Sequence, residues 1–74
     1  MRRGDLVTPG LGGVHRYRDY VLAWTRMGNG RPVRIPRGAV GIVVRVRGQW
    51  PRVMFDGYVY SVDERDFAVV SAAT

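Results

Sequence analysis

The stretch that decides the fold runs from Ala39 to Val62 and has the sequence AVGIVVRVRGQWPRVMFDGYVYSV. It contains three short runs of alternating residues separated by two tight-turn signals. Asp56-Gly57 is a strong hairpin signal, because both central residues of a type I′ turn need positive φ and Asp-Gly tolerates it. Gly48-Gln49 fits the type II′ turn, in which glycine comes first. The stretch therefore predicts a three-stranded antiparallel meander at residues 39–62.

The two turns also predict a register. The first turn places Ile42 opposite Phe55, and the second places Phe55 opposite Tyr58. Because side chains alternate between the two faces of a strand, both hairpins predict the same apolar face toward the core. The predicted buried residues are Ile42, Val44, Val53, Phe55, Tyr58 and Tyr60. The predicted opposite face is basic and aromatic and carries Val43, Arg45, Arg47, Trp50, Arg52, Met54, Val59 and Ser61.

Length and composition exclude several classes of protein. With 74 residues the chain is one small domain, and the absence of cysteine excludes a disulfide framework and a thiolate metal site. The longest apolar run, from Gly38 to Val44, is far shorter than the roughly 18 residues that suggest a membrane span. Met1-Arg2-Arg3 is not followed by the apolar segment of a signal peptide. We therefore expect a cytoplasmic protein.

The formal net charge is +6, and every basic residue is arginine. Eight arginines lie in residues 1–37 against Asp5 and Asp19, whereas residues 56–74 carry four acids against Arg65. An arginine-only composition is typical of coding in a GC-rich genome, and it also suits bidentate contacts to carboxylates and phosphates. The sign of the charge predicts an acidic partner, either nucleic acid or an acidic protein surface.

The residues before the meander predict a basic lead-in (residues 1–4), a short first strand and a long first loop (residues 9–37). The strand would close the sheet with Leu6 or Val7 in the core. The loop is longer than the connections that compact domains usually leave without structure, so we expect it to have order of its own or a function.

Two structures are possible within this loop. Tyr17, Tyr20, Val21 and Trp24 have the spacing of one helical face. Alternatively, residues 20–27 pair with residues 31–35 as a protruding hairpin around Gly28-Asn29-Gly30, with Pro32 and Pro36 restricting the return arm to a sheet edge. We favour the hairpin or an irregular loop, because the helical run is short and lacks a clean cap.

The segment after the meander predicts a helical turn and a last strand. Ser61-Val62-Asp63-Glu64 has the Ser-x-x-Glu spacing of a capping box, and only one turn of helix fits before a strand at residues 67–70. We expect the tail, residues 71–74, to fray.

Four motifs, in this order, carry a resemblance to a known family: Gly4-Asp5-Leu6-Val7, Gly38-Ala39-Val40-Gly41-Ile42-Val43, Val53-Met54-Phe55-Asp56-Gly57 and Asp63-Glu64-Arg65-Asp66-Phe67. Together they resemble the SH3-like barrel family, including its KOW and Tudor-like domains, over nearly the whole chain. The resemblance implies an all-β single domain, residues 1–74, built as a barrel of about five short antiparallel strands. In that family the long first loop and the neighbouring barrel surface bind peptide, protein or nucleic acid.

Catalysis has little support in the sequence. His15 is the only histidine and Glu64 the only glutamate, and nothing in their spacing indicates a nucleophile activated by a base. The acids Asp63, Glu64 and Asp66 match no metal-binding loop and are better explained by capping and charge pairing. We therefore expect no enzymatic activity, no metal and no cofactor.

The first candidate site lies on the meander. Arg45 opposes Arg52, and because opposed like charges destabilise a strand pair, either both side chains extend into water or the pair serves an anionic partner. Trp50 adds a surface that would stack on bases or anchor a protein, unless the long loop covers it and the arginines only keep the protein soluble. The candidate nucleic-acid-binding residues are Arg45, Arg47, Trp50 and Arg52.

The second candidate site is the basic amino-terminal half. Its mixture of aromatic residues and arginine is typical of interface hot spots, although Tyr20 and Trp24 would equally form a second small core. The candidate partner-binding residues are Arg2, Arg3, Arg16, Tyr17, Arg18, Arg26, Arg31, Arg34 and Arg37.

The whole chain, which is basic, free of lysine and starts Met1-Arg2-Arg3-Gly4-Asp5, also resembles a family of small lytic-phage transcription regulators. The resemblance implies a stoichiometric inhibitor and antiterminator that binds a large subunit of bacterial RNA polymerase near the RNA exit region. We expect the chain to be monomeric and to act in the host cytoplasm. The resemblance assigns no contact residues. The alternative is a stand-alone module of the KOW or Tudor-like type that binds RNA or DNA directly.

Overall fold

The computed structural model describes residues 1–10, 19–25, 30–46, 48 and 50–73. Within these residues the chain is all-β, as predicted, with one short 3-10 turn. The elements are β1 (Leu6–Pro9), β2 (Tyr20–Trp24), β3 (Pro32–Pro36), β4 (Gly41–Arg45), β5 (Arg52–Phe55), β6 (Tyr58–Val62), η2 (Glu64–Asp66) and β7 (Phe67–Ser71).

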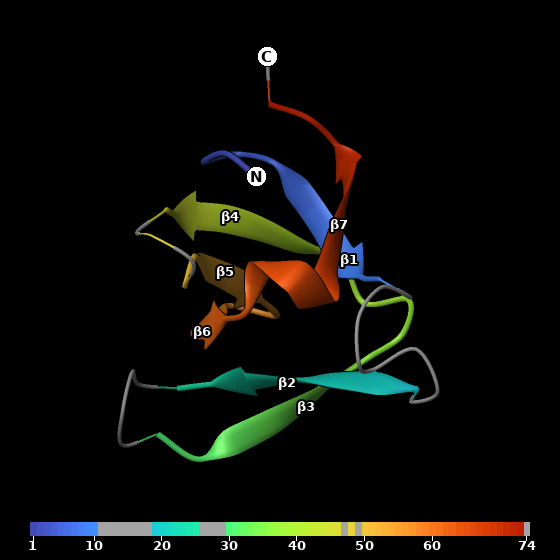
Figure 1. Cartoon of the computed structure of the whole chain (residues 1–74), viewed down its shortest axis with the longest axis vertical. Helices are drawn as coiled ribbons and strands as arrows, with labels where there is room; N and C mark the ends of the chain where they lie inside the picture. Colours follow the sequence, from blue (N-terminus) through green and yellow to red (C-terminus); the bar gives the residue numbers. More distant parts are fainter. Residues whose placement is uncertain (11–18, 26–29, 47, 49, 74) are drawn as a thin grey trace.

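The seven described strands form one open antiparallel sheet in the order β3-β2-β6-β5-β4-β1-β7. Figure 1 shows β2 and β3 lying together below the other strands, and β7 running next to β1. The predicted number of about five strands was therefore too low. The two further strands, β2 and β3, come from the segment that we expected to be a long first loop.

The hairpin alternative for this loop is confirmed. Tyr20 pairs with Pro36 and Trp24 with Pro32, and β3 is an edge of the sheet, as its two prolines require because they lack an amide hydrogen. The hairpin does not simply protrude, because Ala23 pairs with Val62 of β6. The helical alternative is wrong for residues 20–24, and Tyr17 lies outside the described residues.

The second hairpin of the meander has the predicted register. Phe55 pairs with Tyr58 and Val53 with Tyr60. Asp56 and Gly57 have φ values of 50° and 82°, as a type I′ turn requires. Val53 and Phe55 are buried as predicted, but Tyr58, at the hairpin end, is 70% exposed and was wrongly placed in the core.

The first hairpin of the meander departs from the predicted register within β4. Arg45 opposes Arg52 as predicted, but the register then shifts by one residue, so that Val43 rather than Val44 opposes Val53. Such a β-bulge inserts one residue into a strand and turns the residues beyond it to the other face. The predicted burial of Ile42 and Val44 is therefore wrong; both are half-buried, and Val43 is in the core with 1% exposure.

The core lies on one face of the sheet, which we call the inner face. Its buried apolar residues are Val7, Val21, Ala23, Ile35, Val43, Val53, Phe55 and Val62. The ring centroid of Phe55 lies 5.9 Å from that of Phe67 and 6.4 Å from that of Tyr60. Gly41 brings the backbone of β4 against this cluster, since a Cβ at Gly41 would lie 2.7 Å from atoms of Phe55 and Val53.

The end of the chain is more ordered than we expected. The N-cap of η2 is Asp63, whose carboxylate accepts a hydrogen bond from the Arg65 amide, and the predicted cap, Ser61, is buried in β6. The predicted fraying of the tail is wrong for residues 71–73. Ser71 still belongs to β7, and the Ala73 amide donates a hydrogen bond to Asp5 Oδ1 over 2.7 Å. No helix among the described residues is long and apolar enough to cross a membrane.

Candidate partner-binding surface

A line of side chains crosses five strands on the face opposite the core, which we call the outer face. Directly paired residues of antiparallel strands place their side chains on the same face. Arg45 pairs with Arg52, Arg52 with Ser61, Ser61 with Trp24, and Trp24 with Pro32. These five residues, from β4, β5, β6, β2 and β3, form what we call the arginine line.

A second line on the outer face is apolar. Leu6 pairs with Ile42, Ile42 with Met54, and Met54 with Val59, so that one line crosses β1, β4, β5 and β6. We call these four residues the apolar line. Leu6, Met54 and Val59 are 38%, 36% and 42% exposed, and Ile42 is half-buried. Exposed aliphatic side chains are thus contiguous here, rather than scattered singly over the surface as is normal.

The two lines border each other. Arg52 and Met54 are two residues apart in β5, so they share a face at a spacing of roughly 7 Å. The outer face therefore presents a band of exposed aliphatic side chains next to two opposed, exposed arginines. The arginine pair was predicted from the sequence. The apolar line was not, because Ile42 had been assigned to the core and Leu6 considered for it.

The tryptophan of the meander packs against the β2–β3 hairpin. The ring centroids of Trp24 and Trp50 are 5.9 Å apart with an interplanar angle of 83°, an edge-to-face contact. Trp50 is half-buried. Trp24 comes from the segment expected to be the long first loop, so the structure agrees with the interpretation in which that segment covers Trp50. Part of the Trp50 surface is consequently unavailable for stacking on a base.

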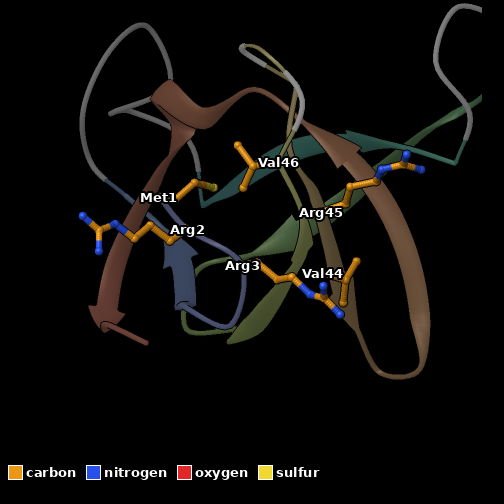
Figure 2. A pocket seen from close by; sticks show the side chains of 6 residues that line it. All are labelled: Met1, Arg2, Arg3, Val44, Arg45 and Val46. Carbon is orange, nitrogen blue, oxygen red and sulfur yellow. The ribbon is translucent and has the colours of Figure 1, made fainter. Parts of the chain in front are cut away.

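The basic lead-in lies against β4. The Gly4 amide donates to the Val43 carbonyl over 2.7 Å, and the Val43 amide donates to the Asp5 carbonyl over 2.9 Å. A shallow pocket of about 640 Å³ lies between the lead-in and β4, and Figure 2 shows the side chains that line it. It is lined by Met1, Arg2, Arg3, Val44, Arg45 and Val46. Arg3, a candidate of the amino-terminal set, and Arg45, a candidate of the meander set, thus line the same pocket.

The other described candidates of the amino-terminal set lie at the far end of the sheet. Arg31, Arg34 and Arg37 are exposed in or beside β3, and the guanidinium carbon of Arg34 lies 4.6 Å from the ring centroid of Tyr20. This is a cation–π contact, which orders the Arg34 side chain on the surface. Since the amino-terminal arginines lie near β4 and β1, the described candidates of this set do not form one cluster. Arg16, Tyr17, Arg18, Arg26 and Arg47 lie outside the described residues, as does His15.

The acids Asp5 and Asp63 have structural partners. The backbone amides of Ala73 and Arg2 donate hydrogen bonds to the buried Asp5 carboxylate. These two bonds, the Ala73 bond more strongly, lower the pKa of Asp5 below its ordinary value of 3.8. The hydrogen bond to Asp63 raises the pKa of Arg65, whose guanidinium lies 2.7 Å from Asp63 Oδ2. Among the residues that the structure describes, no three metal-ligating side chains lie close enough to hold a metal ion.

Comparison with known proteins adds no relative. No protein-family model matches the chain, and no significant match was found among curated proteins or among solved structures. The outer face and the charge distribution are therefore the observations on which a function has to be argued.

Proposed function

We propose that this chain is a non-enzymatic binding protein whose outer face docks on an acidic surface of a protein partner. The single observation that supports a protein partner is the apolar line bordered by Arg45 and Arg52. Protein interfaces combine an apolar, desolvated centre with a polar rim and are enriched in arginine. A nucleic acid, by contrast, is held through its phosphates and by stacking on aromatic rings, and it gains little from exposed aliphatic side chains.

The partner that we propose is a large subunit of bacterial RNA polymerase, with the chain acting as an inhibitor or antiterminator of transcription in the cytoplasm of a phage host. Two observations support this proposal: the resemblance of the whole chain to small phage transcription regulators, and the net charge of +6, which would steer the chain toward an acidic surface.

We also propose that the sheet is a variant of the SH3-like barrel. The strands β1, β4, β5, β6 and β7, with the single helical turn η2 before the last strand, follow the order implied by the resemblance. In this interpretation the β2–β3 hairpin is an addition that extends the sheet beyond β6.

The test is to measure how tightly purified polymerase binds the wild-type chain and a variant in which residues of the apolar line are replaced. Met54→Ser with Val59→Thr removes exposed apolar surface, and we expect it to weaken binding about tenfold or more, as truncation of an interface centre does. Val40→Thr is the matched control, because Val40 is 53% exposed but belongs to neither line; it should leave the affinity within about twofold. Failure of the folded wild-type chain to bind polymerase at moderate salt would refute the polymerase proposal.

Direct binding of RNA or DNA is the second candidate function, and the two opposed arginines beside Trp50 favour it. Arg45→Ala with Arg52→Ala would then weaken oligonucleotide binding and reduce the slope of log Kd against log salt by about two. The apolar pair of substitutions separates the two functions. Met54→Ser with Val59→Thr should weaken a protein complex while leaving oligonucleotide affinity unchanged, and the opposite pattern would favour nucleic acid.

A further inference from the structure

The two edges of the sheet differ in how they are protected. The edge strand β3 carries Pro32 and Pro36 and the exposed Arg34, and prolines and charges are the features that prevent another strand from pairing. The opposite edge strand, β7, contains no proline and no charged residue from Phe67 to Ser71. Its Val69 and Val70 are 45% and 54% exposed. An edge of this kind is a template for an added strand.

One side of β7 is occupied and the other is open in the described part of the chain. β7 pairs with β1, and the strand order ends at β7, so no described strand lies beyond it. The register of the β1–β7 pair shifts between Leu6 and Val7, which leaves Phe67, Ala68 and Val69 as the regular part of β7. The Phe67 amide already donates to the Glu64 carbonyl, so an added strand would pair with the outward-facing backbone groups that follow this amide in β7.

Opposite charges mark the two ends of β7. At its carboxyl end, the Asp5 carboxylate accepts hydrogen bonds from both the Arg2 amide and the Ala73 amide, each over 2.7 Å, which fixes Arg2 next to residue 73. Figure 2 shows the Arg2 side chain extending past β7. At its amino end, Glu64 is exposed at the start of η2, which ends directly before Phe67, and the neighbouring Arg65 is paired with Asp63.

We propose that two copies of this chain pair antiparallel along β7. Antiparallel pairing of identical strands about a two-fold axis places the carboxyl end of each β7 beside the amino end of the other. Arg2 of each copy then meets Glu64 of the other, so the dimer contains this ion pair twice. The uncharged strand between them also suits a second copy, because in a chain with a net charge of +6 most other contacts would bring arginines together.

The proposal has consequences for affinity and for the outer face. An interface of two short strands is at the small end of specific contacts, so we expect a Kd of roughly 10⁻⁴ M. Edge pairing uses the backbone of β7 and leaves the arginine and apolar lines of both copies open. The dimer replaces the monomeric state that we expected from the sequence, and it does not depend on the proposed polymerase partner.

Sedimentation velocity of the purified chain between about 10 µM and about 1 mM tests the dimer, a range that brackets the expected Kd. The wild-type chain should shift from monomer to dimer over this range. Arg2→Glu and Glu64→Arg should each weaken association about fivefold or more, because each places like charges together at both ends, and the double variant should restore it. Arg3→Glu is the matched control, since it makes the same charge change at the next exposed residue, which takes no part in the two hydrogen bonds that join residue 2 to residue 73; it should associate like the wild type.

Two further results bear on the proposal. Val69→Lys places a charge on the open edge and should keep the chain monomeric, with circular dichroism confirming that it is folded. A wild-type chain that remains monomeric at about 1 mM, or a double charge swap that associates no better than the single variants, would overturn the proposal. In that case the open edge of β7 would be a candidate site for a strand of a different protein.

Discussion

Gly41 and Asp5 each hold a position that no other residue type fills equally well. Gly41 leaves room for the ring of Phe55 where β4 crosses the core, and Asp5 joins the backbone at residue 2 to the backbone at residue 73. Both are single-residue constraints, and each leads to a prediction that depends on one side chain.

Gly41→Ala should destabilise the fold by about 1–3 kcal/mol, because the added Cβ overlaps Phe55 and Val53 at 2.7 Å and the packed core has to shift. Gly10→Ala is the matched control, since its Cβ would make only ordinary contacts at 3.5 Å. Urea denaturation of both variants measures the difference. Equal stability of the two variants would show that the core adjusts without cost.

Asp5 should make stability depend on acid pH. Its pKa is lowered in the folded state, so its contribution is complete above the ordinary value of 3.8 and is lost as the pH falls through the lower, folded-state value. Asp5→Asn should therefore melt at a lower temperature than the wild type near neutral pH, and should lose less further stability on acidification below 3.8. Asp56→Asn is the control, because it removes a carboxylate in the same way from the exposed β5–β6 turn. Parallel pH profiles for Asp5→Asn and the wild type would contradict the assignment.

At the scale of elements, the bulge in β4 marks the limit of what the sequence could predict. The turn signals correctly placed Arg45 opposite Arg52 and Phe55 opposite Tyr58, because short turns fix the pairing next to them. Ile42-Val43-Val44 is apolar throughout, so no alternation showed which of these residues faces the core. The sequence therefore did not reveal the extra residue of the bulge. Because this residue turns Ile42 to the outer face, the apolar line was not predicted either.

In the β2–β3 hairpin, too, local features could be predicted from the sequence and long-range contacts could not. Its edge position followed from local chemistry, since Pro32 and Pro36 cannot donate hydrogen bonds to a neighbouring strand. Its attachment to β6 depends on a contact between Ala23 and Val62, which are far apart in the sequence and carry no local signal for each other. Covering of Trp50 by this segment was one of the two interpretations of the sequence, but the position of Trp24 on the arginine line and its role as the residue that contacts Trp50 could not be predicted, for the same reason.

Arg45→Glu should stabilise the β4–β5 pair while impairing function. The substitution replaces two opposed like charges with an opposed ion pair, which contributes roughly 0.2–1 kcal/mol on a sheet surface. Urea denaturation at low salt should show this gain, and about 1 M salt should remove most of it. Arg31→Glu, outside the paired strands, is the control. Binding of the proposed acidic partner should fall for Arg45→Glu even though the fold is more stable.

At the scale of the whole molecule, the net charge of +6 and the apolar line should act on different steps of binding. Charge accelerates the approach of an oppositely charged partner over distances of about a Debye length, whereas buried apolar contacts slow dissociation. Arg52→Ala should therefore lower the association rate constant and its dependence on salt. Met54→Ser should raise the dissociation rate constant instead. Surface-based kinetic measurements at several salt concentrations separate these effects, and identical kinetic changes in the two variants would contradict this division.

The edge-to-face contact between Trp24 and Trp50 gives the molecule a built-in optical reporter. These are the only two tryptophans in the chain, so its indole fluorescence originates from one place, at the β2 side of the arginine line. A partner that docks on the outer face changes the solvent around this pair and should shift its emission without any attached dye. Pairing along β7 takes place at the far edge of the sheet and should leave the emission unchanged. A single unlabelled titration can therefore tell occupation of the outer face from self-association.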